Sequence, residues 1–168
     1  MKTYTPPDAE PRAPARNVTL KDLIGSGDRI MLFTLPFVVV GVILSAAFPS
    51  LFHIDGSSSA LRVLAIVLLI PGVTIWVWSV VLILRKVPRG ELITSGPFAL
   101  MKHPIYTSVA LLVLPAIGVV FDSWLGAFIG IALYVGSRIY SPAEERELSR
   151  TFGARWDAYR GAVLIPWL

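Results

Sequence analysis

The chain has 168 residues, of which 55% are hydrophobic and only 15% are charged, whereas an average soluble domain carries roughly 25% charged residues. The charges leave long uncharged stretches, which are typical of membrane spans rather than of a soluble core. The absence of cysteine excludes disulfides, thiolate metal sites and cysteine nucleophiles, and the net charge of +4 does not require a nucleic-acid partner, because basic residues beside an anionic leaflet account for it.

The first half of the chain is predicted to be a tail followed by membrane anchors. Residues 1–17 are rich in proline and alanine and are expected to be disordered. Residues 18–84 are expected to hold a short interfacial helix (18–28) and two anchoring transmembrane helices. The uncharged runs 30–52 and 63–84 predict these helices, because each is long enough to cross a bilayer core of roughly 30 Å.

Two shorter uncharged runs follow a loop over residues 85–103, which is too rich in glycine and proline to be a continuous helix. These runs, 104–121 and 123–137, are near the minimum length for a span, and only Asp122 separates them. A single long helix would bury Asp122 in the membrane at a cost of several kcal/mol. We therefore expect a tight helical hairpin with its turn at 121–123.

A new helix is expected after the fourth span. Ser141 fits the N-cap, Pro142 fits the first helical position, and acidic residues follow in the first turn. This helix should end near Phe152, with Gly153 beyond its end. A short segment over 155–160 should follow, and residues 163–168 can return to the membrane surface.

The positive charges predict the orientation. All of the 15 lysines and arginines except Arg62 lie in the N-terminal segment, the middle loop or the C-terminal segment. By the positive-inside rule these three segments are cytosolic. The predicted fold is therefore an all-α integral membrane bundle of about four transmembrane helices, the third and fourth forming a tight hairpin, with short cytosolic C-terminal helices. Both termini should face the cytosol from the cytoplasmic (inner) membrane.

Polar residues gather at two places, 95–106 and 138–160, which the hairpin should bring together at the cytosolic surface. Pro104 at a first helical position leaves the first-turn amides available to an anion such as a carboxylate. Glu144 or Glu145 can accept two ribose hydroxyls, and aromatic residues such as Phe98 and Tyr106 can stack on a purine or face a sulfonium. This mixture suits a zwitterion that carries an adenosine.

In order along the chain, these residues resemble the isoprenylcysteine carboxyl methyltransferase and phospholipid methyltransferase superfamily of integral membrane enzymes. The resemblance covers about residues 93–168. It rests on Gly96-Pro97-Phe98, Lys102-His103-Pro104-Ile105-Tyr106, Arg138, Glu144-Glu145, Phe152-Gly153, Trp156, Tyr159 and Pro166. The chain departs from the family pattern at Phe98, where tyrosine is usual, at Lys102, where arginine is usual, and at Ser108, where glycine is usual.

The resemblance implies an S-adenosylmethionine-dependent methyltransferase whose catalytic half is 85–168. Its acceptor would be lipophilic, such as a prenyl-cysteine carboxylate or a lipid headgroup, and it would need no metal. The implied cofactor-binding residues come from both polar regions: Gly96, Phe98, Lys102, His103, Pro104, Tyr106, Glu144 and Glu145. The candidate catalytic residues are Glu145, Tyr106 and Arg138; Lys102 and Arg138 could also bind the cofactor carboxylate or an acidic substrate group.

The alternative function is a small, non-enzymatic membrane anchor or adaptor. In that case His103 would cap a helix, Tyr106 would belong to an interfacial aromatic belt, and Arg138 would be a snorkelling anchor. A haem protein is disfavoured because His53 and His103 are expected on opposite membrane faces. A transporter is disfavoured because the expected spans contain almost no ionisable residue.

Overall fold

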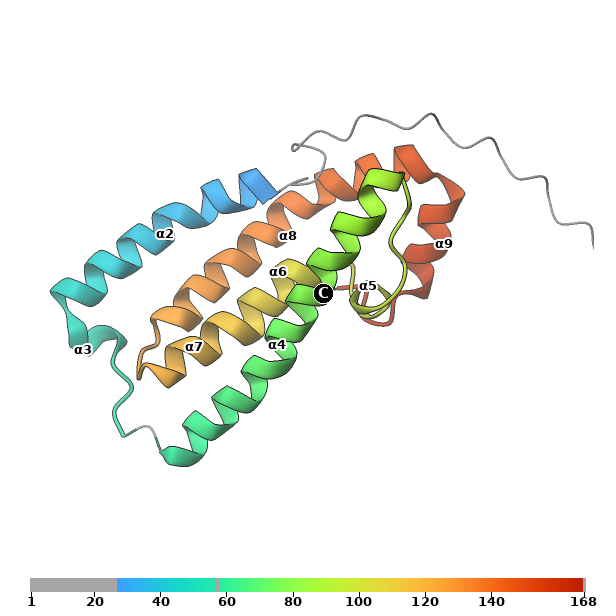
Figure 1. Cartoon of the computed structure of the whole chain (residues 1–168). Helices are drawn as coiled ribbons and strands as arrows, with labels where there is room; N and C mark the ends of the chain where they lie inside the picture. The colour runs from blue at the N-terminus through green and yellow to red at the C-terminus, as the bar shows by residue number, and fades with distance from the viewer. Residues whose placement is uncertain (1–26, 57, 168) are drawn as a thin grey trace, which may run out of the picture.

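The computed structural model describes residues 27–56 and 58–167 (Figure 1). The predicted tail 1–17 lies outside the described residues, as does nearly all of the predicted interfacial helix 18–28. The described part is all-α, as the sequence predicts, with isolated β-bridges between loop segments. Its long helices are α2 (Gly27–Ala47), α4 (Ser59–Lys86) and α8 (Leu125–Phe152).

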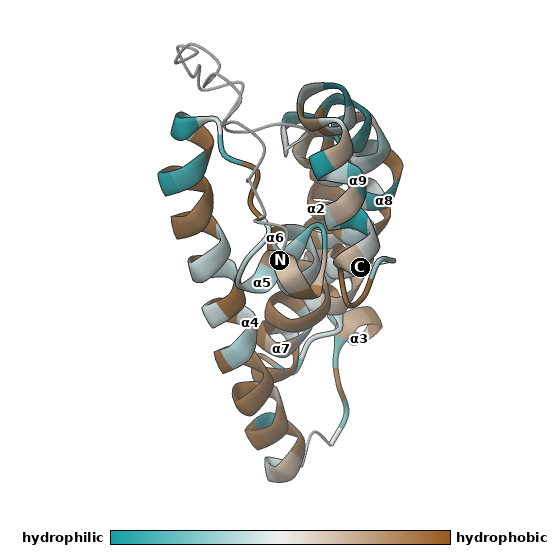
Figure 2. Cartoon of the chain, turned by 90° about the vertical axis from the view of Figure 1, so that its right-hand side faces the viewer, coloured by the Kyte–Doolittle hydropathy of each residue, from teal (hydrophilic) through white to brown (hydrophobic). Residues whose placement is uncertain are grey.

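Two of the described helical segments, Gly27–Ala47 and Ser59–Arg89, are long and apolar enough to cross a membrane. Only 17% and 11% of their apolar windows are buried inside the protein, so most of their side chains face outward. Figure 2 shows α4 hydrophobic along most of its length and hydrophilic at the end that leads into the next loop. Outward-facing apolar side chains of this extent are typical of helices that face lipid.

The first predicted span differs in detail from the expected run 30–52. α2 ends at Ala47, and a separate short helix, α3 (Pro49–Phe52), follows it. A proline disfavours the helical conformation in the residue before it. Phe48 accordingly leaves the helical region, with φ −133° and ψ 72°, and the chain turns there.

The predicted hairpin is present. Its first arm is an apolar helical segment, Pro104–Val120, made of α6 (Pro104–Ser108), a π-helical turn (Val109–Val113) and α7 (Leu114–Val120). The second arm, α8, packs back along it (Figure 1). Small residues allow the close approach: a Cβ on Gly118 would lie 2.5 Å from the Ser123 carbonyl oxygen, and one on Gly126 would overlap the Leu114 carbonyl oxygen.

The turn of the hairpin is tied to the helices that precede it. Asp122 has a left-handed φ of 53°, and its carboxylate accepts a 2.6 Å hydrogen bond from Arg62. The Asp122 carbonyl accepts from the Ile54 amide at 2.9 Å, and the Trp124 amide donates to the Phe52 carbonyl at 2.7 Å. Arg62, the one basic residue outside the three basic segments, therefore has a specific structural partner.

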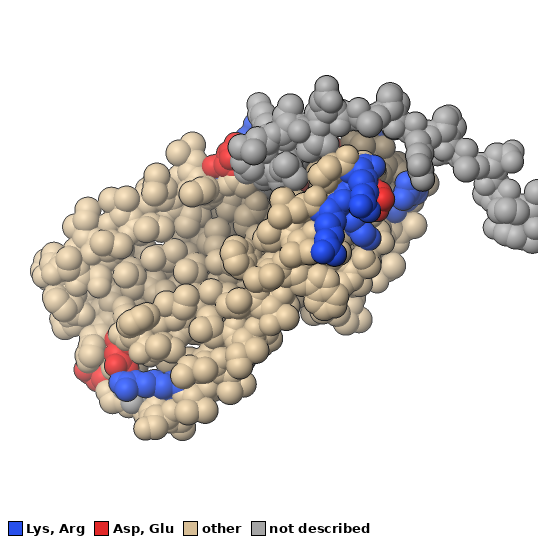
Figure 3. All heavy atoms as spheres, viewed as in Figure 1, with Lys and Arg blue, Asp and Glu red and all other residues tan. Residues whose placement is uncertain are grey.

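Charged side chains gather at the two ends of the molecule. On the face shown in Figure 3, a wide belt without charge separates them, and lysine and arginine dominate one end. That end includes Arg85, Lys86 and Arg89, where α4 passes through a 3₁₀ turn (Val87–Arg89) into the loop. Such a belt is the surface expected of a protein that sits in a bilayer.

The predicted new helix at Ser141 is wrong. α8 is continuous from Leu125 to Phe152 with Pro142 inside it, so the fourth apolar run and the expected cytosolic helix are one helix. Phe33 of α2 packs against Gly136 and against the Tyr140 ring just before the proline. This packing keeps α8 helical across Pro142, although a proline removes one backbone hydrogen bond from the helix. The predicted end is confirmed: Gly153 caps α8 with φ 51°.

Replacement of Gly126 by valine should disrupt the hairpin, because its side chain would overlap the α7 backbone. We expect the apparent free energy of unfolding in detergent to fall by about 1–3 kcal/mol, measured by thermal or denaturant unfolding. Gly161→Ala is the matched control, since a Cβ at Gly161 meets nothing within 4 Å. A Gly126→Val protein as stable as the control would contradict this packing.

Candidate functional site

The segment that carries the first polar region follows an irregular path between α4 and α6. It begins at Gly96, whose φ of 65° is left-handed, and a Cβ there would lie 3.1 Å from the Trp78 ring. One helical turn, α5 (Pro97–Leu100), comes next. Pro104 then occupies the first position of α6, as the sequence predicts, and His103 precedes it at the N-cap position without a capping hydrogen bond from its side chain. These local features set the path of the chain from Gly96 to the start of α6.

Lys102 and His103 meet Glu145 of α8. Lys102 Nζ donates to Glu145 Oε1 at 2.6 Å, and His103 Nε2 lies 3.2 Å from the same oxygen. The side chains of Lys102, His103 and Glu145 are 10%, 8% and 19% exposed. We call these three residues the ion-pair cluster. It confirms that the two polar regions predicted to be neighbours are brought together.

The ion-pair cluster keeps Glu145 negatively charged. The hydrogen bond from His103 lowers the pKa of Glu145 most; burial opposes the change, and the hydrogen bond and charge of Lys102 lower the pKa further, to about 2. A partly buried carboxylate is otherwise driven to protonate. At neutral pH this carboxylate is therefore available as an acceptor of hydrogen bonds and is a very weak base.

α9 (Ala154–Ala162) lies beside the ion-pair cluster. Trp156 and Tyr159 are buried together with Val163, and the Tyr159 hydroxyl donates to the Phe98 carbonyl at 2.8 Å. Burial, and after it the charge of Glu145, raise the pKa of Tyr159 to about 12. The hydroxyl therefore stays protonated and can act as a donor throughout the neutral range.

A mixed polar and aromatic cavity of about 280 Å³ lies between α8 and α9. Glu145 forms part of its wall, so the cavity borders the ion-pair cluster. Its charged and aromatic lining differs from the lipid-facing surface of the helices. The lining residues are Pro142, Glu145, Arg146, Ser149, Trp156 and Arg160.

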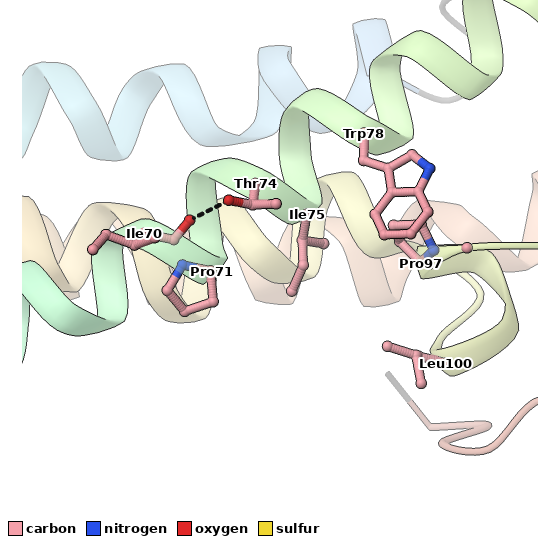
Figure 4. Close-up of a pocket in the computed structure, with 8 residues that line it drawn as sticks. Ile70, Pro71, Thr74, Ile75, Trp78, Pro97 and Leu100 are labelled. Carbon is pink, nitrogen blue, oxygen red and sulfur yellow. Dashed lines mark hydrogen bonds between the residues drawn. The ribbon is translucent and has the colours of Figure 1, made fainter.

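An apolar groove of about 400 Å³ runs between α4 and α5 (Figure 4). The hydroxyl of Thr74 donates to the Ile70 carbonyl of its own helix at 2.8 Å, so it adds little polarity. The α5 residues of the groove lead directly into Lys102 and His103, which connects the groove to the ion-pair cluster. The lining residues are Ile70, Pro71, Thr74, Ile75, Trp78, Gly96, Pro97 and Leu100.

The other candidate residues lie outside the ion-pair cluster. Tyr106 and Glu144 are partly buried near the two ends of the hairpin. Phe98 contributes its carbonyl to Tyr159. Arg138 is exposed and precedes Glu145 on α8 by about two helical turns, or about 10 Å along the helix axis. The structure therefore does not bring Arg138 to the ion-pair cluster.

The sequence predicts α4 only as an anchor, yet five of its residues line the apolar groove. It also gives no role to Arg146, Ser149 or Arg160, which line the mixed cavity. For α4, the available signal was a proline and a threonine close together, Pro71 and Thr74, within the long apolar stretch of the helix. For the cavity there was no local signal, because its walls come together only when α9 packs against α8.

The chain matches a known protein family. Residues 57–150 match the model of the isoprenylcysteine carboxyl methyltransferase (ICMT) family. The matched range includes all of α4, the hairpin and most of α8, and therefore every member of the ion-pair cluster. No curated protein and no solved structure matches the chain.

Lowering the pH should weaken the ion-pair cluster and lower the stability of the protein. Because the pKa of Glu145 is lowered from 4.5 to about 2, its pairing stabilises the fold above its ordinary pKa and is lost as pH falls from there toward the lowered value. Between about pH 5 and 3 the melting temperature of the wild-type protein in detergent should fall more steeply than that of Glu145→Gln. Glu147→Gln, at an exposed position, should follow the wild type. Parallel curves for wild type and Glu145→Gln would refute the assignment.

Proposed function

Because the chain belongs to the isoprenylcysteine carboxyl methyltransferase family, a family of S-adenosylmethionine-dependent membrane enzymes, we propose that it methylates a lipophilic acceptor at the cytosolic face of a membrane. The observation that carries this proposal is the ion-pair cluster. It joins the loop before the hairpin to the far end of α8, the second arm of the hairpin. Glu145 also lines a cavity with polar and charged side chains, and the α5 turn that precedes the loop lines an apolar groove.

The side chains that line the mixed cavity between α8 and α9 have the chemistry needed to bind S-adenosylmethionine. Glu145 can accept the two ribose hydroxyls, the Trp156 indole offers an aromatic surface to a purine or a sulfonium, and Arg146 or Arg160 can bind a carboxylate. Its volume of about 280 Å³ is near the lower end for ligand pockets. His103, Pro104, Tyr106 and Glu144 would complete the binding site from the hairpin, together with Gly96, Phe98 and Lys102.

The apolar groove between α4 and α5 would hold the hydrocarbon chain of the acceptor. Ile70 and Trp78 at its rim are 64% and 53% exposed, so the groove is open sideways, where α4 faces lipid. An acceptor can therefore enter from the bilayer without its chain crossing water. Its polar end would then follow α5 toward Lys102 and His103.

The protonation state of the site favours an acceptor that needs no general base. S-adenosylmethionine, when bound, supplies an electrophilic methyl group on its sulfonium. A general base works best with a pKa near the operating pH, and Glu145, with a pKa of about 2, is far below it. Glu145 is therefore proposed to orient ligands. An acceptor carboxylate, which Lys102 can attract and which is already a nucleophile, fits better than a protonated amine.

We propose that the chain makes four spans, with both termini and the site in the cytosol; two of the described helices are long and apolar enough to cross a membrane, and a third apolar helix is shorter. The end of the molecule that carries Arg85, Lys86 and Arg89 also carries the ion-pair cluster, and the opposite end has the Arg62–Asp122 pair (Figures 1 and 3). The excess of positive charge at the first end is the pattern of cytosolic loops. Arg138 would lie near this surface, available to an acidic group of the acceptor.

Glu145→Ala and His103→Ala should each abolish tight binding of S-adenosylhomocysteine and methyl transfer. The purified protein is given radiolabelled S-adenosylmethionine with either prenyl-cysteine analogues or total lipid extract, and binding is measured by calorimetry. Glu147→Ala, at an exposed position on the same helix, is the control and should behave as wild type. Absence of both labelled product and S-adenosylhomocysteine binding in the wild type would leave a membrane anchor or adaptor as the function.

Filling the apolar groove should weaken binding of the acceptor and leave binding of the cofactor unchanged. Ile75→Trp places a larger ring in the groove and should raise KM for a long-chain acceptor by about tenfold or more, since each buried CH₂ contributes about 0.8 kcal/mol. The dissociation constant of S-adenosylhomocysteine should not change. Val67→Trp, at an exposed position of α4 outside the groove, is the control. Equal KM values in the two variants would exclude the groove as the acceptor site.

A further inference from the structure

The C-terminal segment is bonded to three successive backbone carbonyls of α5. The Tyr159 hydroxyl donates to the Phe98 carbonyl at 2.8 Å. The Leu164 amide donates to the Ala99 carbonyl at 3.2 Å, and the Ile165 amide donates to the Leu100 carbonyl at 2.8 Å. Three donors from one short stretch of chain thus satisfy three consecutive acceptors of another.

α5 needs these donors because it is a single helical turn. The last carbonyls of a helix have no partner within the helix, and in α5 only the Pro97 carbonyl accepts an amide of its own turn, that of Met101. Met101 is then extended, with φ −147° and ψ 151°, and is followed by Lys102 and His103. The position of these two side chains therefore depends on contacts outside the loop.

Tyr159 is itself held rigidly. Its ring is buried with Trp156 and Val163, and Leu92, Leu148 and Phe152 pack around them. This apolar cluster joins α9 to α8, the helix that carries Glu145. Trp156 also lines the mixed cavity, so the same small core supports both the cavity wall and the donor to Phe98.

We propose that Tyr159 is a positioning residue for the reaction: its hydroxyl holds α5 so that Lys102 and His103 reach Glu145. This inference rests on the proposed function for its effect on turnover, but its structural part applies to the ligand-free protein. The raised pKa of Tyr159, about 12, keeps the hydroxyl protonated, so it can donate this bond throughout the neutral range.

Tyr159→Phe tests the proposal, because it removes the hydroxyl and keeps the ring in the apolar cluster. In the ligand-free variant, amide hydrogen exchange over residues 98–103 should accelerate at least about tenfold, because the bond no longer opposes opening of this loop. Methyl transfer should lose about ten- to a hundredfold in kcat, the scale expected of misplaced reacting groups. Tyr134→Phe, a tyrosine of α8 away from this loop, should match wild type in both measurements.

Ile165→Pro is the second variant, used if Tyr159→Phe does not fold. It deletes the amide that donates to Leu100 and leaves Tyr159 in place, and it should also accelerate exchange over 98–103. Wild-type exchange and wild-type kcat in the folded variants would overturn the positioning role. If the wild-type protein shows no methyl transfer but the variants show the expected faster exchange, the proposed function is overturned and the positioning contact is kept.

Discussion

The arrangement of the site depends on one carboxylate oxygen. Glu145 Oε1 accepts from Lys102 and lies within hydrogen-bonding distance of His103, which are 43 and 42 residues earlier in the chain. Removing a charged carboxylate from water costs free energy unless nearby cations and hydrogen-bond donors compensate for the loss. The same contacts that keep it ionised also hold the loop before the hairpin against the far end of α8. The proposed ligand-binding site and the contact between the loop and α8 therefore depend on the same interaction.

The continuity of α8 determines what surrounds this carboxylate. Glycines hold the apolar part of α8 against α7, and the same rigid helix then carries Glu145 beyond the apolar belt to α9. Because the helix does not break at Pro142, the hairpin packing transmits directly to the position of Glu145. The mixed cavity forms on the α9 side of that residue, and the apolar groove forms where the loop to Lys102 passes α4.

The hairpin and the meeting of its two ends could be predicted from the sequence because span lengths and the single charge at Asp122 leave few alternatives. The helix start at Ser141 was wrong because a local capping pattern was outweighed by the packing of Phe33 on Gly136 and Tyr140. The groove on α4 could not be predicted, since in lipid every face of a helix is apolar and periodicity carries no information about which face binds. The role of Tyr159 depends on a hydrogen bond across 61 residues, and no local pattern encodes such a contact.

A double-mutant cycle between Lys102 and Glu145 tests the central interaction most directly. The apparent free energy of unfolding in detergent is measured for wild type, Lys102→Met, Glu145→Gln and the double variant. If the two side chains share one partly buried contact, the double variant should be less destabilised than the sum of the single variants, with a coupling of about 0.5–3 kcal/mol. Strictly additive losses would mean that the loop and α8 are held together in some other way, and would contradict the site described for this protein.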